Sequence, residues 1–83
     1  MRLAKNVKFR EEKFGGVLFE TRSEKVYTLN PTATAVVREI QAGSAELDIP
    51  RRLKERFRDE SDTIEREASA FIAELRQKGL VED

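Results

Sequence analysis

The side chains that most often perform chemistry in proteins are scarce in this chain of 83 residues. It contains no cysteine and no histidine, which excludes thiolate nucleophiles, imidazole bases and zinc sites built from those ligands. The remaining candidates are 16 aspartate and glutamate residues, balanced by 16 lysine and arginine residues. No spacing among the carboxylates singles out an acid–base pair, and we expect them to be solvated on helix faces. The sequence therefore predicts a protein that is not an enzyme and has no catalytic residue, metal or cofactor.

Two adjacent glycines, Gly15-Gly16, form the one motif that suggests phosphate binding. A phosphate-binding loop also needs a Lys-Ser or Lys-Thr pair and a following helix. Val17-Leu18-Phe19 follows instead, and such a short apolar run is typical of a strand. The glycines are therefore predicted to form a turn between two strands.

Three short strands are predicted in the first 29 residues. Val7 and Phe9 alternate with charged residues, Val17-Leu18-Phe19 is continuously apolar, and Val26-Tyr27-Thr28-Leu29 is rich in strand-forming side chains. The short polar connections between them favour an antiparallel meander. A sheet of only three strands needs a second layer on one face to be stable.

Three amphipathic helices are predicted after the strands. Each begins with a side chain that can cap a helix: Asn30, Asp48 and Asp62. Glu65 would complete a capping box with Asp62, and Gly43 and Gly79 are expected to end the first and third helices. The predicted apolar stripes are Ala33, Val36, Val37 and Ile40 in the first helix, Ile49, Leu53 and Phe57 in the second, and Ile64, Ala68, Phe71, Ile72 and Leu75 in the third.

The order of three strands and then three helices indicates an α+β fold, and the length indicates a single domain over residues 1–83. The second and third helices are joined by the polar segment Asp59-Glu60-Ser61, which is typical of a helix-turn-helix pair. A three-stranded antiparallel sheet beside this pair gives a winged helix-turn-helix outline. We expect Leu80-Val81 to pack back onto the domain.

No apolar run is long enough to span a membrane, and no apolar signal core follows Met1, so we expect a cytoplasmic protein without a membrane partner. Charge is unevenly distributed along the chain. Residues 1–29 carry seven basic and four acidic side chains, a net charge of +3, whereas residues 61–83 carry three basic and six acidic, a net charge of −3. The sequence leaves open whether this asymmetry is a solvated surface or orients a partner.

Several segments resemble the PqqD family of peptide-modification chaperones, also described as RiPP recognition elements. (RiPPs are ribosomally made peptides that are modified after synthesis.) The matching segments are, in order, Arg10–Gly16, Val26–Asn30, Thr32-Ala33 and Phe71–Val81. The resemblance extends from about residue 7 to residue 81. The segment Gly43–Ile49 and the short loop from Arg58 to Ser61 depart from the family pattern, which leaves the particular pathway open.

This resemblance implies a domain that binds the leader of a precursor peptide and presents it to a modifying enzyme, often a radical SAM protein. The leader would add as a strand beside Val26, Tyr27, Thr28 and Leu29. The helical wall of its groove would consist of Ala68, Ile72, Leu75 and Arg76. Arg76 is then either solvated or a clamp for an acidic leader residue. The pathway would be pyrroloquinoline quinone (PQQ) synthesis or another peptide-modifying pathway.

An exposed edge strand can also pair with its copy in another chain, so we expect a monomer or a weak homodimer.

A basic cluster in the second predicted helix supports an alternative function: Arg51, Arg52, Lys54, Arg56 and Arg58. A winged helix with such a cluster could bind DNA phosphates. Neighbouring carboxylates, the acidic third helix and the zero net charge favour instead a chain that binds no nucleic acid. Docking of the partner enzyme is a further use that the sequence leaves open for the basic cluster.

Overall fold

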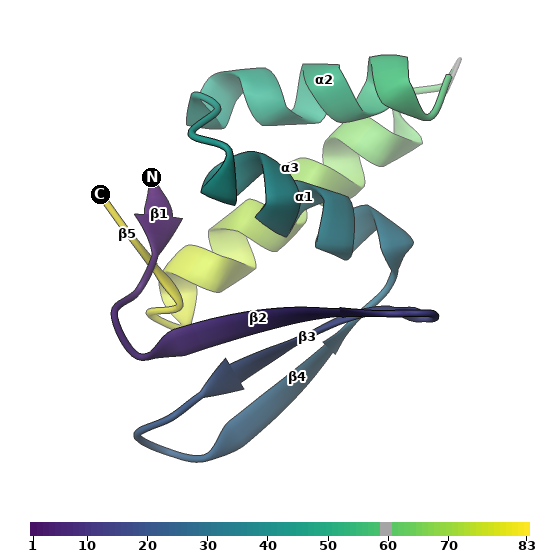
Figure 1. Ribbon diagram of the computed structural model, residues 1–83. Coiled ribbons are helices and arrows are strands. Elements are labelled where there is room, and N and C mark those ends of the chain that lie inside the picture. The colour runs from purple at the N-terminus through teal and green to yellow at the C-terminus, as the bar shows by residue number, and fades with distance from the viewer. Residues whose placement is uncertain (59–60) are drawn as a thin grey trace.

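The computed structural model describes residues 1–58 and 61–83, and has the α+β architecture that the sequence predicts (Figure 1). Three antiparallel strands form a sheet in chain order: β2 (Val7–Glu12), β3 (Gly15–Glu20) and β4 (Lys25–Leu29). Three helices follow: α1 (Pro31–Gln41), α2 (Ile49–Arg56) and α3 (Thr63–Gln77). Of the predicted connection between α2 and α3, residues 59 and 60 lie outside the described residues.

Two further strands, β1 (Arg2–Leu3) and β5 (Val81–Glu82), pair with each other and hold the two chain ends side by side (Figure 1). The amide of Ala4 donates a hydrogen bond to the Leu80 carbonyl at 2.8 Å, which extends this pairing. The prediction that Leu80-Val81 packs back is confirmed, since both side chains are buried. The strand pair itself was not predicted.

The helices cover one face of the sheet, with α1 in contact with the sheet and with both other helices. Val36, Val37 and Ile40 of its predicted stripe are buried. The buried stripe of α3 consists of Ala68, Ile72 and Leu75. The stripe predicted for α2 is wrong at Phe57, which is 42% exposed because α2 ends one residue before it.

Successive side chains along each strand point to opposite faces of the sheet. Leu18 and Leu29 are buried under the helices, whereas Phe19 and Val26 are exposed on the opposite face. No described element covers that opposite face (Figure 1). Strand β4 therefore presents one row of side chains to the helical layer and one row to solvent.

The start of α1 and the ends of α1 and α3 follow the prediction. Asn30 Oδ1 accepts a hydrogen bond from the Ala33 amide at 2.8 Å and so caps α1. Gly43 and Gly79 each lie two residues beyond the last helical residue, in the left-handed region.

Asp48 and Asp62 occupy the N-cap positions of α2 and α3 as predicted, but the expected side-chain caps are absent, because neither side chain accepts a backbone N–H of its helix. Asp48 instead binds Arg51 at 3.1 Å, and Asp62 binds Lys54 at 2.9 Å. Lys54 also pairs with Glu65 at 3.3 Å, so the expected capping box is replaced by an ion-pair group between α2 and α3. A nearby cation competes successfully with the helix N–H groups for each carboxylate.

The two glycines are not the turn between β2 and β3, which consists of Lys13-Phe14; they are the first residues of β3. Their role is to let neighbouring parts of the chain approach the β3 backbone closely. A Cβ on Gly15 would lie 2.2 Å from the Leu29 carbonyl oxygen, and one on Gly16 would lie 2.9 Å from Thr34 Oγ1. The glycines therefore allow β3 to approach the end of β4 and the first turns of α1.

We predict that Gly15→Ala lowers the free energy of unfolding by roughly 3 kcal/mol, because its φ of +146° strains any L side chain and the methyl group meets backbone. Gly43→Ala is the matched control, since Gly43 also has a positive φ, +87°, but nothing lies within 4 Å of an added Cβ. It should cost only about 1 kcal/mol. Urea denaturation of both variants measures the difference, and equal losses of stability would contradict the close-contact role.

One carboxylate is buried among the helices. Glu39 of α1, with a side chain 10% exposed, accepts hydrogen bonds from Ser44 Oγ at 2.6 Å and from Arg52 Nε at 2.7 Å. The Ser44 hydroxyl lowers the pKa of Glu39, and the Arg52 guanidinium adds to this effect against the opposing effect of burial. The group joins α1 to α2 across their connection.

We predict that Glu39→Gln destabilises the fold by about 1–2 kcal/mol at neutral pH, because it removes a buried charged acceptor. The pKa of Glu39 in the folded chain lies below its ordinary value of 4.5. Its stabilising contribution is therefore complete above that value and is lost as the pH falls through the folded-state pKa. Denaturation curves measured over falling pH should show the two proteins converging, and a pH-independent difference would contradict this role.

Candidate peptide-binding groove

Strand β4 lies at an edge of the sheet, since the order β2-β3-β4 leaves one of its long sides without a partner strand among the described residues. An edge strand presents N–H and C=O groups that a second extended chain can pair with. Strand β2 forms the other edge. What distinguishes β4 is the surface beside its open edge.

A groove runs between β4 and α3. Its central part has a volume of about 330 Å³. The strand contributes four lining residues: Val26, Tyr27, Thr28 and Leu29. The opposite wall comes from α3 and the residue that follows it: Phe71, Glu74, Leu75 and Lys78. The buried side chains Leu18, Leu29, Leu75 and Leu80 also line the groove, so its floor is part of the hydrophobic core.

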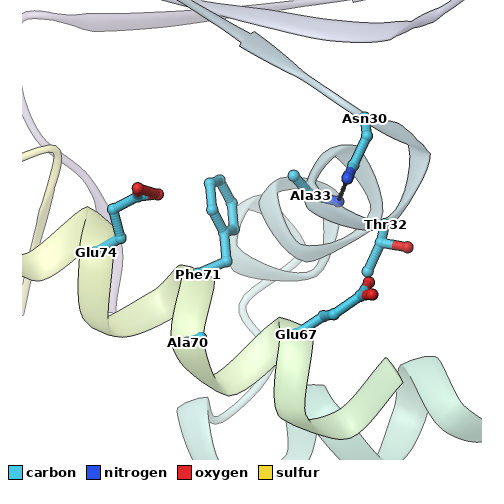
Figure 2. A pocket seen from close by; sticks show the side chains of 7 residues that line it. All are labelled: Asn30, Thr32, Ala33, Glu67, Ala70, Phe71 and Glu74. Atoms are coloured by element: carbon cyan, nitrogen blue, oxygen red, sulfur yellow. Dashed lines mark hydrogen bonds between the residues drawn. The ribbon is translucent and has the colours of Figure 1, made fainter. Parts of the chain in front are cut away.

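The groove continues beyond both ends of this central part. Toward the start of α1 it opens into a hollow of about 350 Å³, which shares Phe71 and Glu74 with the central part. Figure 2 shows the Phe71 ring projecting from α3 into this space, with Glu67 and Glu74 on either side of it. Toward the turn between β3 and β4 the groove opens into a hollow of about 620 Å³, which shares Tyr27, Lys78 and Leu80.

Tyr27 and Lys78 face each other across the central groove. The Lys78 Nζ lies 5.4 Å from the centroid of the Tyr27 ring, a cation–π distance. Lys78 also pairs with Glu74 at 3.1 Å, one helical turn away, and these side chains are 41% and 51% exposed. Exposed pairs of this kind contribute little to stability. A ligand can therefore exchange these contacts for its own.

Five of the eight residues predicted to contact a leader line this groove: Val26, Tyr27, Thr28, Leu29 and Leu75. Leu29 and Leu75 lie in its floor, Tyr27 is half-buried toward α3, and Val26 is 59% exposed. The other three do not line it. Ala68 and Ile72 are buried in the core.

Arg76, the third of these residues, is held away from the groove. Its guanidinium pairs with Glu46 and, at 3.3 Å, with Asp83. These contacts tie α3 to the turn before α2 and to the chain end, so the structure gives Arg76 two carboxylate partners within the chain.

The groove wall contains three residues that sequence reasoning did not assign to it: Phe71, Glu74 and Lys78. Spacings of three and four residues place them on the helical stripe next to the buried one. The only signal in the sequence is Phe71, an apolar residue at the margin of the predicted stripe, with Glu67 four residues before it and Glu74 three residues after it. Sequence periodicity identified the residues at the centre of the apolar stripe of α3, whereas the groove is lined by residues at the margin of that stripe.

The basic cluster of α2 is occupied by contacts within the chain. Arg52 and Arg56 lie 2.7 Å and 4.0 Å from the Glu39 carboxylate. Arg51 and Lys54 bind the carboxylates that were expected to cap α2 and α3. Most of the charge that suggested DNA binding is thus compensated by ion pairs that join α2 to its neighbours.

Within residues 1–58 and 61–83, no three carboxylate, thiol or imidazole side chains gather as a metal site would require. In the same residues, the structure contains no helix with the length and apolarity needed to cross a bilayer.

Comparison with known proteins gives one family and two similar structures. The family model described as coenzyme PQQ synthesis protein D (PqqD) matches residues 15–81. A solved lasso peptide synthetase B1 complexed with the leader peptide has a TM-score of 0.80 and 25% identity, with 99% of this chain and 96% of that chain covered. TbiB1 in complex with the TbiA(β) leader peptide has a TM-score of 0.83 and 18% identity, with 99% and 95% covered, which shows a shared fold.

No curated protein sequence is significantly similar to the chain. The family match nevertheless includes β3, β4 and the three helices, and hence both walls of the groove. It also covers most of the chain. The chain therefore belongs to the PqqD family.

Proposed function

We propose that this chain binds the leader of a precursor peptide, which adds as a strand along the open edge of β4 and places side chains in the groove beside α3. The observation that carries this proposal is the position of an unpartnered strand edge directly beside a groove with a core-derived floor. The two similar structures support it, because each is a complex with a leader peptide.

The two parts of the site have different tasks in this mechanism. Backbone pairing along β4 contributes affinity that depends little on the leader's sequence, whereas the groove recognises alternate side chains. Strand β4 has five residues and is roughly 16 Å long, so about five leader residues pair with it. Two or three of them face α3.

The chain acts in this proposal as a carrier that performs no chemistry. A separate enzyme modifies the bound precursor, and a radical SAM protein is the class that the PqqD resemblance implies. The absence of cysteine and histidine from the sequence supports a role without thiolate or imidazole catalysis.

We predict that Phe71→Ala weakens binding of a selected peptide by about tenfold or more, because a Phe-sized contact in the groove is lost. The probe is a synthetic peptide obtained by selecting a displayed random library against the unmodified chain. Phe57→Ala is the control, since Phe57 is a phenylalanine that is 42% exposed and lines a different hollow, beside α2. Calorimetry should show unchanged affinity for this control. Equal weakening in both variants would argue against the groove.

We also predict that the bound peptide protects amides of β4 that do not pair with β3 from hydrogen exchange. The outward amides of β2 serve as an internal control, because β2 is the other open edge of the same sheet. NMR-detected exchange with and without the selected peptide distinguishes the two edges. Protection confined to β2, or absent from both edges, would contradict strand addition at β4.

A further inference from the structure

The two ends of the groove carry opposite charge. The hollow next to α1 is lined by two carboxylates, Glu67 and Glu74, and by no basic residue. The hollow at the turn between β3 and β4 is lined by four basic residues, Lys5, Arg22, Lys25 and Lys78, and by two acidic ones, Glu20 and Glu82.

The carboxylates at the basic end already have partners. Glu20 accepts hydrogen bonds from the backbone amides of Arg22 and Ser23, both at 2.9 Å. Glu82 pairs with Arg2 at 3.0 Å. Lys5 and Lys25, in contrast, have no carboxylate within ion-pair distance in the described part of the chain. This end therefore presents uncompensated positive charge to a ligand.

At the acidic end, Glu67 is uncompensated in the same sense. Across residues 1–58 and 61–83, no basic group lies within ion-pair distance of Glu67, and Glu74 is paired with Lys78 in an exposed contact at 3.1 Å. The first turn of α1 also lies at this end, but its Ala33 amide already donates a hydrogen bond to Asn30 Oδ1. Figure 2 shows the two carboxylates flanking the Phe71 ring.

The spacing of these charges matches an extended peptide. Glu67 and Lys78 are separated along α3 by roughly 16 Å, from the helical rise per residue. This equals the length of the five-residue edge of β4. Alternate side chains of a strand on that edge point toward α3, so one peptide segment reaches the acidic end, the Phe71 ring and the basic end in turn.

We propose that the groove selects leaders by charge pattern: a lysine or arginine for Glu67 and Glu74, an apolar residue for Phe71, and, for Lys5 and Lys25, an aspartate or glutamate about four or six residues from the basic one, an even spacing that keeps both on the side facing α3. The inference rests on the proposed function, since it names the class of leader for the same groove. Complementary charge at an exposed groove adds specificity, because a leader with reversed charges meets like charge at both ends.

The test is a selection of displayed random peptides, each about twelve residues long, against the chain at low ionic strength. The unmodified chain should enrich peptides with a basic and an acidic residue about four or six positions apart on either side of an apolar residue. Replacing the basic residue of a selected peptide with an acidic one should weaken its binding by about tenfold or more. Glu67→Lys should restore binding of that charge-reversed peptide. Glu55→Lys, the same charge change on an exposed residue of α2, is the control and should restore nothing.

The outcomes separate the two proposals. Enriched peptides that protect β4 amides from exchange but show no charge pattern, or no rescue by Glu67→Lys, overturn the charge selection and leave leader binding intact. Peptides that bind without protecting β4, or a selection that enriches nothing, overturn both.

Discussion

The unsatisfied backbone edge of β4 is the constraint on which the rest of the structure depends. An open edge is ordinarily a hazard, because it can pair with any extended chain, and proteins usually shorten, charge or cover it. Here the edge stays open, but α3 lies beside it and limits what can approach. In the proposed function, pairing with β4 therefore requires a polypeptide whose side chains also fit the space against Phe71. The general tendency of an edge to pair is thereby restricted to a subset of peptides.

The position of this edge is determined by the hydrophobic core. Leu29 and Leu75 are at once core residues and the floor of the groove, so folding and the shape of the site are coupled. The contact of Gly15 with the Leu29 carbonyl fixes the end of β4, and the pairing of β1 with β5 closes the domain beyond the end of α3. In a domain of 83 residues there is little other structure to hold the two walls in place.

Sequence periodicity was sufficient to predict the strands and helices, but not to predict which of their side chains form caps or line the groove. The strand and helix order was predictable because short alternating or continuous apolar runs precede Asn30, whereas apolar residues recur every three or four residues after it. The side-chain cap at Asp62 was mispredicted because capping is local, whereas the competing cation Lys54 belongs to another helix, α2; Asp48 pairs instead with Arg51, three residues on. Strands β1 and β5 were missed because two-residue strands have no period to detect. The groove wall was predicted to lie on the buried stripe of α3 but lies on the adjacent stripe, since the rotation of α3 relative to β4 is a tertiary property.

The central claim is that a peptide joins the sheet at β4, and intermolecular NMR contacts in a complex with a selected peptide test it most directly. The account predicts Hα–Hα or amide contacts between successive peptide residues and β4, together with contacts from one peptide side chain to the Phe71 ring. Contacts confined to the open face around Phe19 or to α2, with none along the β4 backbone, would contradict it.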